Sequence, residues 1–431
     1  ALAVRAADFL AVGGFDPLVR EDVYGGELSL RVTTHTGGTA GCLPATAVAW
    51  RELPPDARTE SAMARVRENQ ARDRDQWVQA GRPRLAAEQV LPDYRLIGFD
   101  RNRRSQAAPQ PLVVHDRPER PLRWALKIGA PTVERRTNWG DWHFAQSLKA
   151  SLERLGHEVS VDCKDSWYRP SSPLDDVVVQ MRGVSIYGIN PGHTNVSWVI
   201  SHPERVTATE LSDYDLVFGA SPRWCTEMTR QLGRPVTPLL QCTDHHRFHP
   251  VEPDRRRAHE VLVVANARGM RPSVRAALAS GIVPSVYGLR WDGLVPEGAW
   301  QADYIPNDEL AAVYCAAGVV LNDHWDDMRD QGILSNRLFD LAACDARVIT
   351  DHLPEVAEVF GNSVVTFDED TDLAPLVAAQ LAETPEQAQA RRELGERVRR
   401  EHTFDARAAH LAEAVTALRA RNGHPLPNRA K

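Results

Sequence analysis

Apolar runs of strand length alternate with amphipathic helical stretches from Leu122 onward. A helical stretch at 141–155 and a short run at 157–161 follow the first of these apolar runs. Continuous apolar runs with helices between them are typical of parallel strands covered on both faces. The pattern predicts an array of βαβ units with strands at WALKI (124–128), DVVVQM (176–181), VSWVIS (196–201) and DLVFGA (215–220).

The alternation stops at QCTDHHRFHP (241–250) and then begins again. Two such arrays joined by a short hinge predict two Rossmann-like domains that face each other across a cleft, with ligands outside the carboxyl ends of the strands. We assign 122–250 to the first domain, 251–402 to the second and 403–431 to a C-terminal helix and tail. The strands expected in the second domain are EVLVVA (260–265), VPSVYG (283–288), GVVLN (318–322) and RVIT (347–350), and long helices are expected at 385–400 and 404–419.

The part of the chain before Leu122 has a different texture. Residues 1–100 mix short apolar stretches with Gly and Pro, and an Arg-rich helical stretch follows at 60–78. The segment 101–121 is rich in charge and proline and has little periodic apolar content, which predicts a linker.

Composition narrows the class of protein. The chain has 431 residues, of which 43% are hydrophobic and 25% charged, as expected for a globular protein of two or three domains. No apolar run reaches the roughly 18 residues of a membrane span, and a net charge of -7 argues against a nucleic-acid binder. The start without Met indicates a longer gene product, and nothing points to export, so we expect a cytoplasmic location. Six dispersed cysteines without CxxC predict reduced thiols: Cys42, Cys163, Cys225, Cys242, Cys315 and Cys344.

The first candidate site is the loop NWGDWH (138–143), which follows a strand and opens a helix. Gly140 allows close backbone approach, and free N–H groups at the helix start suit an anion or a sugar hydroxyl. Asp141 and His143 are candidate general bases toward an acceptor hydroxyl. The alternative is that Asp141 only caps the helix.

The second candidate is the arginine cluster of NARGMRPSVR (266–275), which follows a buried strand. Arg268 and Arg271 lie where a diphosphate would meet a helix start, and guanidinium forks match phosphate oxygens. Arg275 lies one turn beyond Arg271, so both can share a helix face. The alternative is a solvated basic face.

The third candidate is the polar run from Val320 to Asp340, which leads from a buried strand into a helix. Here Asp340 is placed to accept hydrogen bonds from both hydroxyls of a ribose, and the backbone around Gly332 to donate to phosphate. A solvated loop is the less favoured alternative.

Three histidines in the hinge form the fourth candidate, beside Asp244. Zinc accepts His245, His246 and His249 in principle, but no Cys or Glu completes a ligand pattern of known spacing. We therefore expect surface histidines at a hinge, and no metal.

The segment 266–361 resembles the C-terminal half of CgeB-like (spore-maturation-type) glycosyltransferases of the GT-B fold. The resemblance rests on VANARGMRPSVRAAL, PSVYGLRW, YIPNDEL and the run VYCAAGVVLNDHWDDMRDQGILSNRLFDLAACDARVITD. In the preceding half, LKIGAPTVERRTNWGDWHFAQSLKASLERLGHEV and VISHPERV are similar to the first domain of such enzymes, and TDHHRFHP occupies the hinge. The resemblance covers about 123–419.

The resemblance implies site residues. In such enzymes the nucleotide sugar lies in the cleft, mainly on the second domain, with the acceptor on the first. It implies that Asp340 holds the ribose and that Arg268 and Arg271 clamp the diphosphate. The implied donor side is Arg268, Arg271, Gly332, Asn336, Arg337 and Asp340, and the implied acceptor side is Asn138, Gly140 and His202.

Two positions depart from the pattern of the resemblance. Many related retaining enzymes carry a Glu eight residues before the ribose carboxylate, where this chain has Gly332. The stereochemistry of the reaction therefore stays open. The second departure is Cys344-Asp345, where Gly commonly follows the small residue.

The first hundred residues are similar to the tail of a family 2 (GT-A) glycosyltransferase, through AVRAADFLAVGGFDPLVREDVYGGELSLRV and LPATAVAWRE. The acidic pair usual before L-x-L-R is reduced to Glu27, and Trp50-Arg51-Glu52 lacks the usual His. We expect a truncated or degenerate domain that serves as a structural extension.

The predicted fold class is α/β, with a GT-B arrangement of two Rossmann-like domains across a cleft, preceded by an N-terminal α/β GT-A fragment. The expected function is a hexosyltransferase that needs neither cofactor nor metal. It would move a sugar from a nucleotide-diphosphate sugar to a glycan or other hydroxyl acceptor, in cell-surface polysaccharide or glycan synthesis. Peripheral contact with the inner face of the plasma membrane is compatible with this. The alternatives are a nucleotide-sugar epimerase on the same fold and a non-catalytic sugar-binding or scaffold protein.

Overall fold

The computed structural model describes residues 121–421 except 134–135, 170–171 and 173–174, together with 6–11, 28, 32, 94–100 and 110–115. The GT-A resemblance therefore lies almost entirely outside the described residues, as does Cys42. Within the segment expected to be a linker, β2 (Gln110–His115) pairs antiparallel with β1 (Tyr94–Asp100). The sequence of β2 contains the apolar run PLVV, whose two valines are β-branched residues that are enriched in strands.

The first domain is a parallel α/β unit whose six strands have the order β4-β3-β5-β6-β7-β8. Strands β3, β5 and β6 are buried along their whole length, as expected for the central strands of a parallel sheet covered on both faces. The elements are β3 (Arg123–Lys127), η1 (Arg136–Asn138), α4 (Gly140–Arg154), β4 (Glu158–Asp162), η2 (Lys164–Ser166), β5 (Val177–Arg182), β6 (Thr194–Val199), η4 (Pro203–Arg205), α5 (Ala208–Leu211), β7 (Leu216–Gly219), α6 (Pro222–Leu232) and β8 (Thr237–Pro238).

The second domain repeats this plan with the strand order β11-β10-β9-β12-β13-β14. All of its strand pairs are parallel. The elements are η5 (Arg255–Arg257), β9 (Val261–Val264), α7 (Pro272–Ala279), β10 (Ser285–Tyr287), β11 (Trp300–Ala302), α8 (Leu310–Ala316), β12 (Val319–Asn322), α9 (Asp326–Asp330), α10 (Asn336–Ala343), β13 (Val348–Asp351), α11 (Pro354–Phe360), η6 (Gly361–Ser363), β14 (Val364–Phe367), α12 (Leu373–Leu381) and α13 (Pro385–Glu401).

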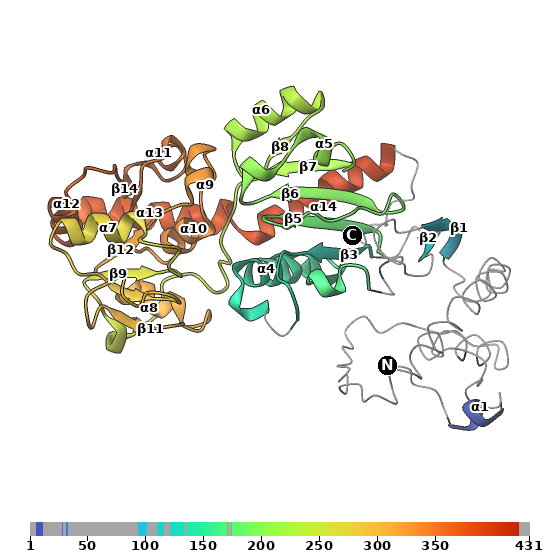
Figure 1. Cartoon of the computed structure of the whole chain (residues 1–431), viewed down its shortest axis with the longest axis horizontal. Helices are drawn as coiled ribbons and strands as arrows, with labels where there is room; N and C mark the ends of the chain where they lie inside the picture. The colour runs from blue at the N-terminus through green and yellow to red at the C-terminus, as the bar shows by residue number, and fades with distance from the viewer. Residues whose placement is uncertain are drawn as a thin grey trace.

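The two-domain α/β fold expected from the hydrophobic pattern is confirmed (Figure 1). The long helices expected near the end of the chain are also present, as α13 and α14 (Phe404–Arg421). Strands β8, β11 and β14 are additions that the pattern did not indicate. All three lie at sheet edges and are only two, three and four residues long.

The last helix returns to the first domain. Figure 1 shows α14 running behind the strands of that domain, and its residues Phe404, Leu411 and Val415 belong to the core around β3 and β5. The ring of Phe404 meets that of Phe144 edge to face, with centroids 4.6 Å apart. The chain therefore crosses between the domains twice, once after β8 and once before α14.

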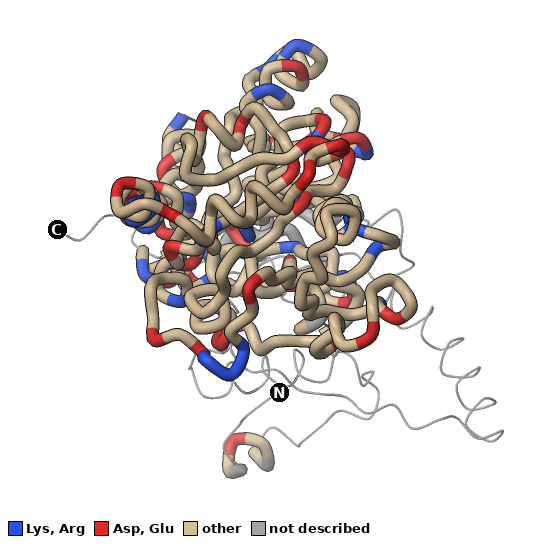
Figure 2. Tube along the Cα trace, turned by 90° about the vertical axis from the view of Figure 1, so that its left-hand side faces the viewer, with Lys and Arg blue, Asp and Glu red and all other residues tan. Residues whose placement is uncertain are grey.

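Two further expectations bear on the described part of the chain. Cys225, Cys242, Cys315 and Cys344 are free thiols. No described helix has the length and apolar character needed to cross a membrane. On the face of the molecule shown in Figure 2, acidic and basic positions are interspersed.

Candidate active site

On the first domain the site begins at the point where the strand order reverses. Because β4 and β5 flank β3 on opposite sides, the loops after β3 and β5 diverge and leave a crevice at their carboxyl ends. Asp141, in the first turn of α4, lies in this crevice. A Cβ at Gly129 would come 3.0 Å from Asp141 Oδ2, and one at Gly183 would come 4.0 Å from it, so both glycines leave room for the carboxylate.

Asp141 is not the helix cap that we considered. The N-cap position of α4 is Trp139, without a side-chain cap, and the Asp141 carboxylate accepts a hydrogen bond from the Gly129 backbone. Burial raises the pKa of Asp141, and its backbone hydrogen bonds oppose that rise. A half-buried carboxylate with a raised pKa at a cleft is suited to accept a proton.

His143 occupies a different position, in the wall of a cavity of about 270 Å³ between the domains. Its Nε2 lies 3.0 Å from the Thr137 carbonyl and donates to it. Trp139 and Gly140 line the same cavity from the first domain. The side chain of Asn138 lies outside the described residues. The two predicted bases therefore point to separate surfaces, Asp141 to the crevice beside Gly129 and His143 to the cavity.

The opposite wall of the cavity comes from the second domain and includes residues that the sequence analysis assigned no role. They follow the carboxyl ends of β9, β10 and β11, where a parallel sheet places ligands. The motifs PSVYGLRW and YIPNDEL contain several of them, which is the signal that could have identified them. They are Val264, Ala265, Asn266, Tyr287, Gly288, Leu289, Asp303, Tyr304, Ile305, Asn307 and Leu310, joined by Arg337 from α10.

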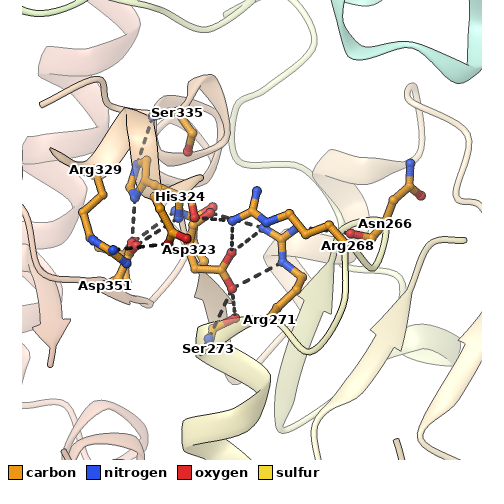
Figure 3. A network of polar contacts seen from close by, with 12 residues as sticks. Asn266, Arg268, Arg271, Ser273, Asp323, His324, Arg329, Ser335 and Asp351 are labelled. Atoms are coloured by element: carbon orange, nitrogen blue, oxygen red, sulfur yellow. Dashed lines mark hydrogen bonds and ion pairs between the residues drawn. The ribbon is translucent and has the colours of Figure 1, made fainter. Parts of the chain in front are cut away.

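The arginine cluster lies at the reversal point of the second sheet, where the loops after β9 and β12 meet (Figure 3). Asp323, at the end of β12, is buried there. It accepts from Arg268 at 3.0 Å, from the Ser273 backbone at 3.2 Å, and from the Arg271 guanidinium and the Ser273 hydroxyl. Burial and the neighbouring Arg337 and Arg268 charges lower the pKa of Arg271 to about 10, against the effect of Asp323.

This network separates the two predicted clamp residues. Arg271 is only 6% exposed and turns inward to Asp323, because a buried carboxylate needs a paired cation. Arg268 keeps more of its side chain accessible and lies over the ring of Trp325, with 4.0 Å from Cζ to the centroid. Arg271 therefore faces Asp323 and not an open cleft, while Arg268 lies nearer to the first domain.

A contact across the cleft joins this network to the first domain. The ring of His202, in the loop after β6, lies 5.6 Å from that of Trp325. His202 has a φ of 53°, an uncommon conformation for a residue with a side chain, and such strain gathers at functional sites. Burial lowers the pKa of His202, and its Nδ1 has no hydrogen-bond partner among the described residues. The Trp325 ring therefore contacts both His202, the acceptor-side candidate, and Arg268 on the donor side.

His324 is a buried residue that the sequence analysis included in a polar run without giving it a role. Its Nδ1 lies 2.6 Å from Asp351 Oδ1, and its Nε2 lies 3.1 Å from the Ser335 backbone nitrogen. Since a backbone N–H can only donate, Nε2 accepts and Nδ1–H donates to Asp351. The pair fixes the loop that leads from β12 to α10.

The residues predicted at the start of α10 lie together but face different partners. Arg337 donates to Asn322 Oδ1 at 3.1 Å and reaches the cavity. Asn336 donates from Nδ2 to Asp340 Oδ2 at 3.2 Å. Asp340 accepts from the Thr243 hydroxyl in the hinge at 2.7 Å, and burial raises its pKa to about 7. The predicted ribose ligand is therefore bonded to the hinge, with 7% of the residue exposed.

Gly332 packs against a carboxylate from another element. Its φ is +71°, and a Cβ at this position would overlap the carboxylate of Glu355 in α11. Glu355 forms an ion pair with Arg223 of the first domain, with 3.0 Å between Arg223 Nε and Glu355 Oε1. An acidic group thus lies beside Gly332 although the residue itself has no side chain.

Two Rossmann-like domains whose strand ends share a cavity form the GT-B architecture. Residues 267–413, which reach into α14, match a protein family described as "Glycosyl transferase-like". No curated protein matches the sequence.

Three solved structures are among those with a similar chain course. AviGT4, a glycosyltransferase involved in avilamycin A biosynthesis, is 17% identical, with 70% of this chain and 99% of that chain covered and a TM-score of 0.47. Sucrose-phosphate synthase from Thermosynechococcus elongatus is 12% identical, with coverages of 70% and 100% and a TM-score of 0.47. HepE from Anabaena, in complex with UDP-glucose, is 12% identical, with coverages of 68% and 99% and a TM-score of 0.47.

Proposed function

We propose that this protein transfers a hexose from a nucleotide-diphosphate sugar to a hydroxyl acceptor, as a CgeB-like enzyme of glycan or cell-surface polysaccharide synthesis. The observation that carries the proposal is the cavity between the domains, with Arg337 on one wall and His143 on the other. The two sheet reversal points, with the arginine cluster at one and Asp141 at the other, lie outside the lining of this cavity.

The donor side supplies positive charge. Burial, and after it the nearby charge of Arg337, lowers the pKa of Arg268 and of Arg271, while Asp323 opposes both shifts. Such a cluster attracts the diphosphate and stabilises the negative charge that develops on it as the glycosidic bond breaks. Arg271 acts through Asp323 by holding the loop, and Arg268 and Arg337 are the residues that contact the donor. This chemistry requires no metal.

The acceptor side supplies a base. In a direct displacement, the acceptor oxygen forms a bond to the anomeric carbon as the bond from that carbon to the diphosphate breaks. The proton of the acceptor hydroxyl passes to the Asp141 carboxylate. The raised pKa of Asp141 favours that transfer. His202 and Gly140 border the acceptor, and His143 contacts the nucleotide or the acceptor from the cavity wall.

Separate variants test binding and chemistry. UDP-glucose is a practical first probe, and a panel of nucleotide sugars follows by thermal shift, because a ligand that binds the native state raises its stability. Arg268→Ala should lose the shift, whereas Arg275→Ala, exposed on α7, is the matched control and should retain it. If Arg268→Ala and Arg337→Ala both bind every donor as well as the wild type does, the donor site is wrong.

Turnover tests the base. Asp141→Asn should bind the donor normally and lose transfer by on the order of 10²–10⁴-fold, whereas Asp213→Asn, at an exposed position, should be unchanged. Nucleoside diphosphate released only when an acceptor is present argues against an epimerase. A protein that binds donors but turns over none of them would be a sugar-binding protein.

A further inference from the structure

The two crossings between the domains run side by side at the hinge. Thr243 on the first crossing and Thr403 on the second form a parallel bridge. Its hydrogen bonds run from the Thr243 N–H to the His402 carbonyl and from the Phe404 N–H to the Thr243 carbonyl, each 3.0 Å long. In a parallel pair, residues at the same offset from the bridge lie near one another. His245 and Asp405, each two residues past the bridge, are therefore brought together.

His246 joins these two residues. The rings of His245 and His246 have centroids 4.0 Å apart. Both Nε2 atoms face Asp405 Oδ2, at 3.8 Å for His245 and 3.4 Å for His246. One ligand atom from each of the three residues lies within 4.8 Å of the others.

These distances are long for hydrogen bonds, which fall near 2.7–3.2 Å for N–H···O. They are close to the distance that separates two ligand atoms bound to the same metal ion. With bonds of about 2.0–2.1 Å, tetrahedral zinc separates neighbouring ligand atoms by roughly 3.3–3.4 Å. Small side-chain movements would bring the three atoms to that spacing and leave the fourth position for water.

We propose that His245, His246 and Asp405 bind a divalent transition-metal ion of the zinc class and thereby tie the two interdomain crossings together. The ion has a route to the site, because His246 lines an open cavity of about 590 Å³ beside the hinge. The site is separate from the donor cleft and does not depend on the proposed transfer reaction.

One nearby positive charge, that of Arg154, would repel the metal ion. The guanidinium of Arg154 on α4 bonds Asp405 Oδ1 and leaves Oδ2 toward the histidines. Its positive charge lowers the affinity for a cation at short range. Removal of this charge should therefore tighten metal binding, an outcome that a chance cluster of surface histidines would not give.

The test uses the full chain, stripped of metal with a chelator and titrated with ZnCl2 by calorimetry, with Co²⁺ absorption reporting tetrahedral coordination. We expect one tight Zn²⁺ per chain. His246→Ala and Asp405→Asn should each weaken binding at least tenfold, and Arg154→Gln should tighten it several-fold. His352→Ala, at an exposed histidine on the second domain, is the matched control and should bind as the wild type does.

Circular dichroism of the metal-free variants verifies that they fold. If Asp405→Asn fails to fold, His246→Ala and Arg154→Gln decide the question. Wild-type affinity in both histidine and aspartate variants, or equal losses in His352→Ala, would overturn the proposal. So would a wild-type chain that binds no Zn²⁺ tightly.

Discussion

Gly332→Ala tests how the Glu355 carboxylate is packed beside α10. The residue has a φ of +71°, where a Cβ costs about 1 kcal/mol. The new methyl group would also overlap Glu355 and force it away from Arg223. That ion pair is worth at most about 1 kcal/mol, since Arg223 is half exposed. A buried carboxylate left without its partner adds about 1–3 kcal/mol. We therefore expect a loss of about 2–5 kcal/mol in the free energy of unfolding.

The matched control for this substitution is Gly233→Ala. Gly233 has nearly the same φ, +70°, but a Cβ there would meet no atom within 4 Å. It should cost only the backbone part, about 1 kcal/mol. Urea unfolding measures both variants, and Glu355→Ala provides a background in which the overlap is absent. Equal costs for the two alanines, or a Gly332→Ala cost unchanged in that background, would refute the packing argument.

Three further changes follow from single contacts. Asp323→Ala should destabilise the second domain by about 3–5 kcal/mol in thermal unfolding, because it leaves buried guanidinium groups unpaired; a loss below 1 kcal/mol would contradict this. Phe404→Ala should cost about 3–5 kcal/mol by removing the ring that packs on Phe144, and the control Thr416→Ala on the same helix should cost far less. Burial raises the pKa of Asp340 from 3.8 to about 7. The folded protein therefore binds this proton more tightly than the unfolded chain does, and its free energy of unfolding falls as the pH rises from 3.8 to about 7. Relative to the wild type, Asp340→Asn should therefore become more stable across this pH range, by up to about 1.4 kcal/mol per pH unit, as measured by urea unfolding. If the unfolding free energies of the two proteins change in parallel with pH, Asp340 does not titrate in this range.

The sequence by itself determined the two-domain plan and the loops that carry the candidate site. Buried parallel strands must be apolar along their length, so the runs at 124–128 and 260–265 were recognisable without a structure. Ligands of such sheets lie at the carboxyl ends of the strands, so the loops 138–143 and 266–271 could be predicted as candidate site loops. Edge strands such as β11 (Trp300–Ala302) escaped because they are short and exposed.

Only the tertiary structure decided which side chains meet. It turned Arg271 inward to Asp323, because those residues follow two strands that are adjacent in the sheet but distant in sequence. It brought the Asp340 carboxylate of α10 against the Thr243 hydroxyl of the hinge. The histidine pattern alone predicted no metal, since the third candidate ligand, Asp405, arrives only where the second crossing runs beside the first. The spacing of hydrophobic residues along the sequence indicates which face of a helix or strand is buried. A contact between residues that are distant in sequence depends on how the helices and strands are arranged in space.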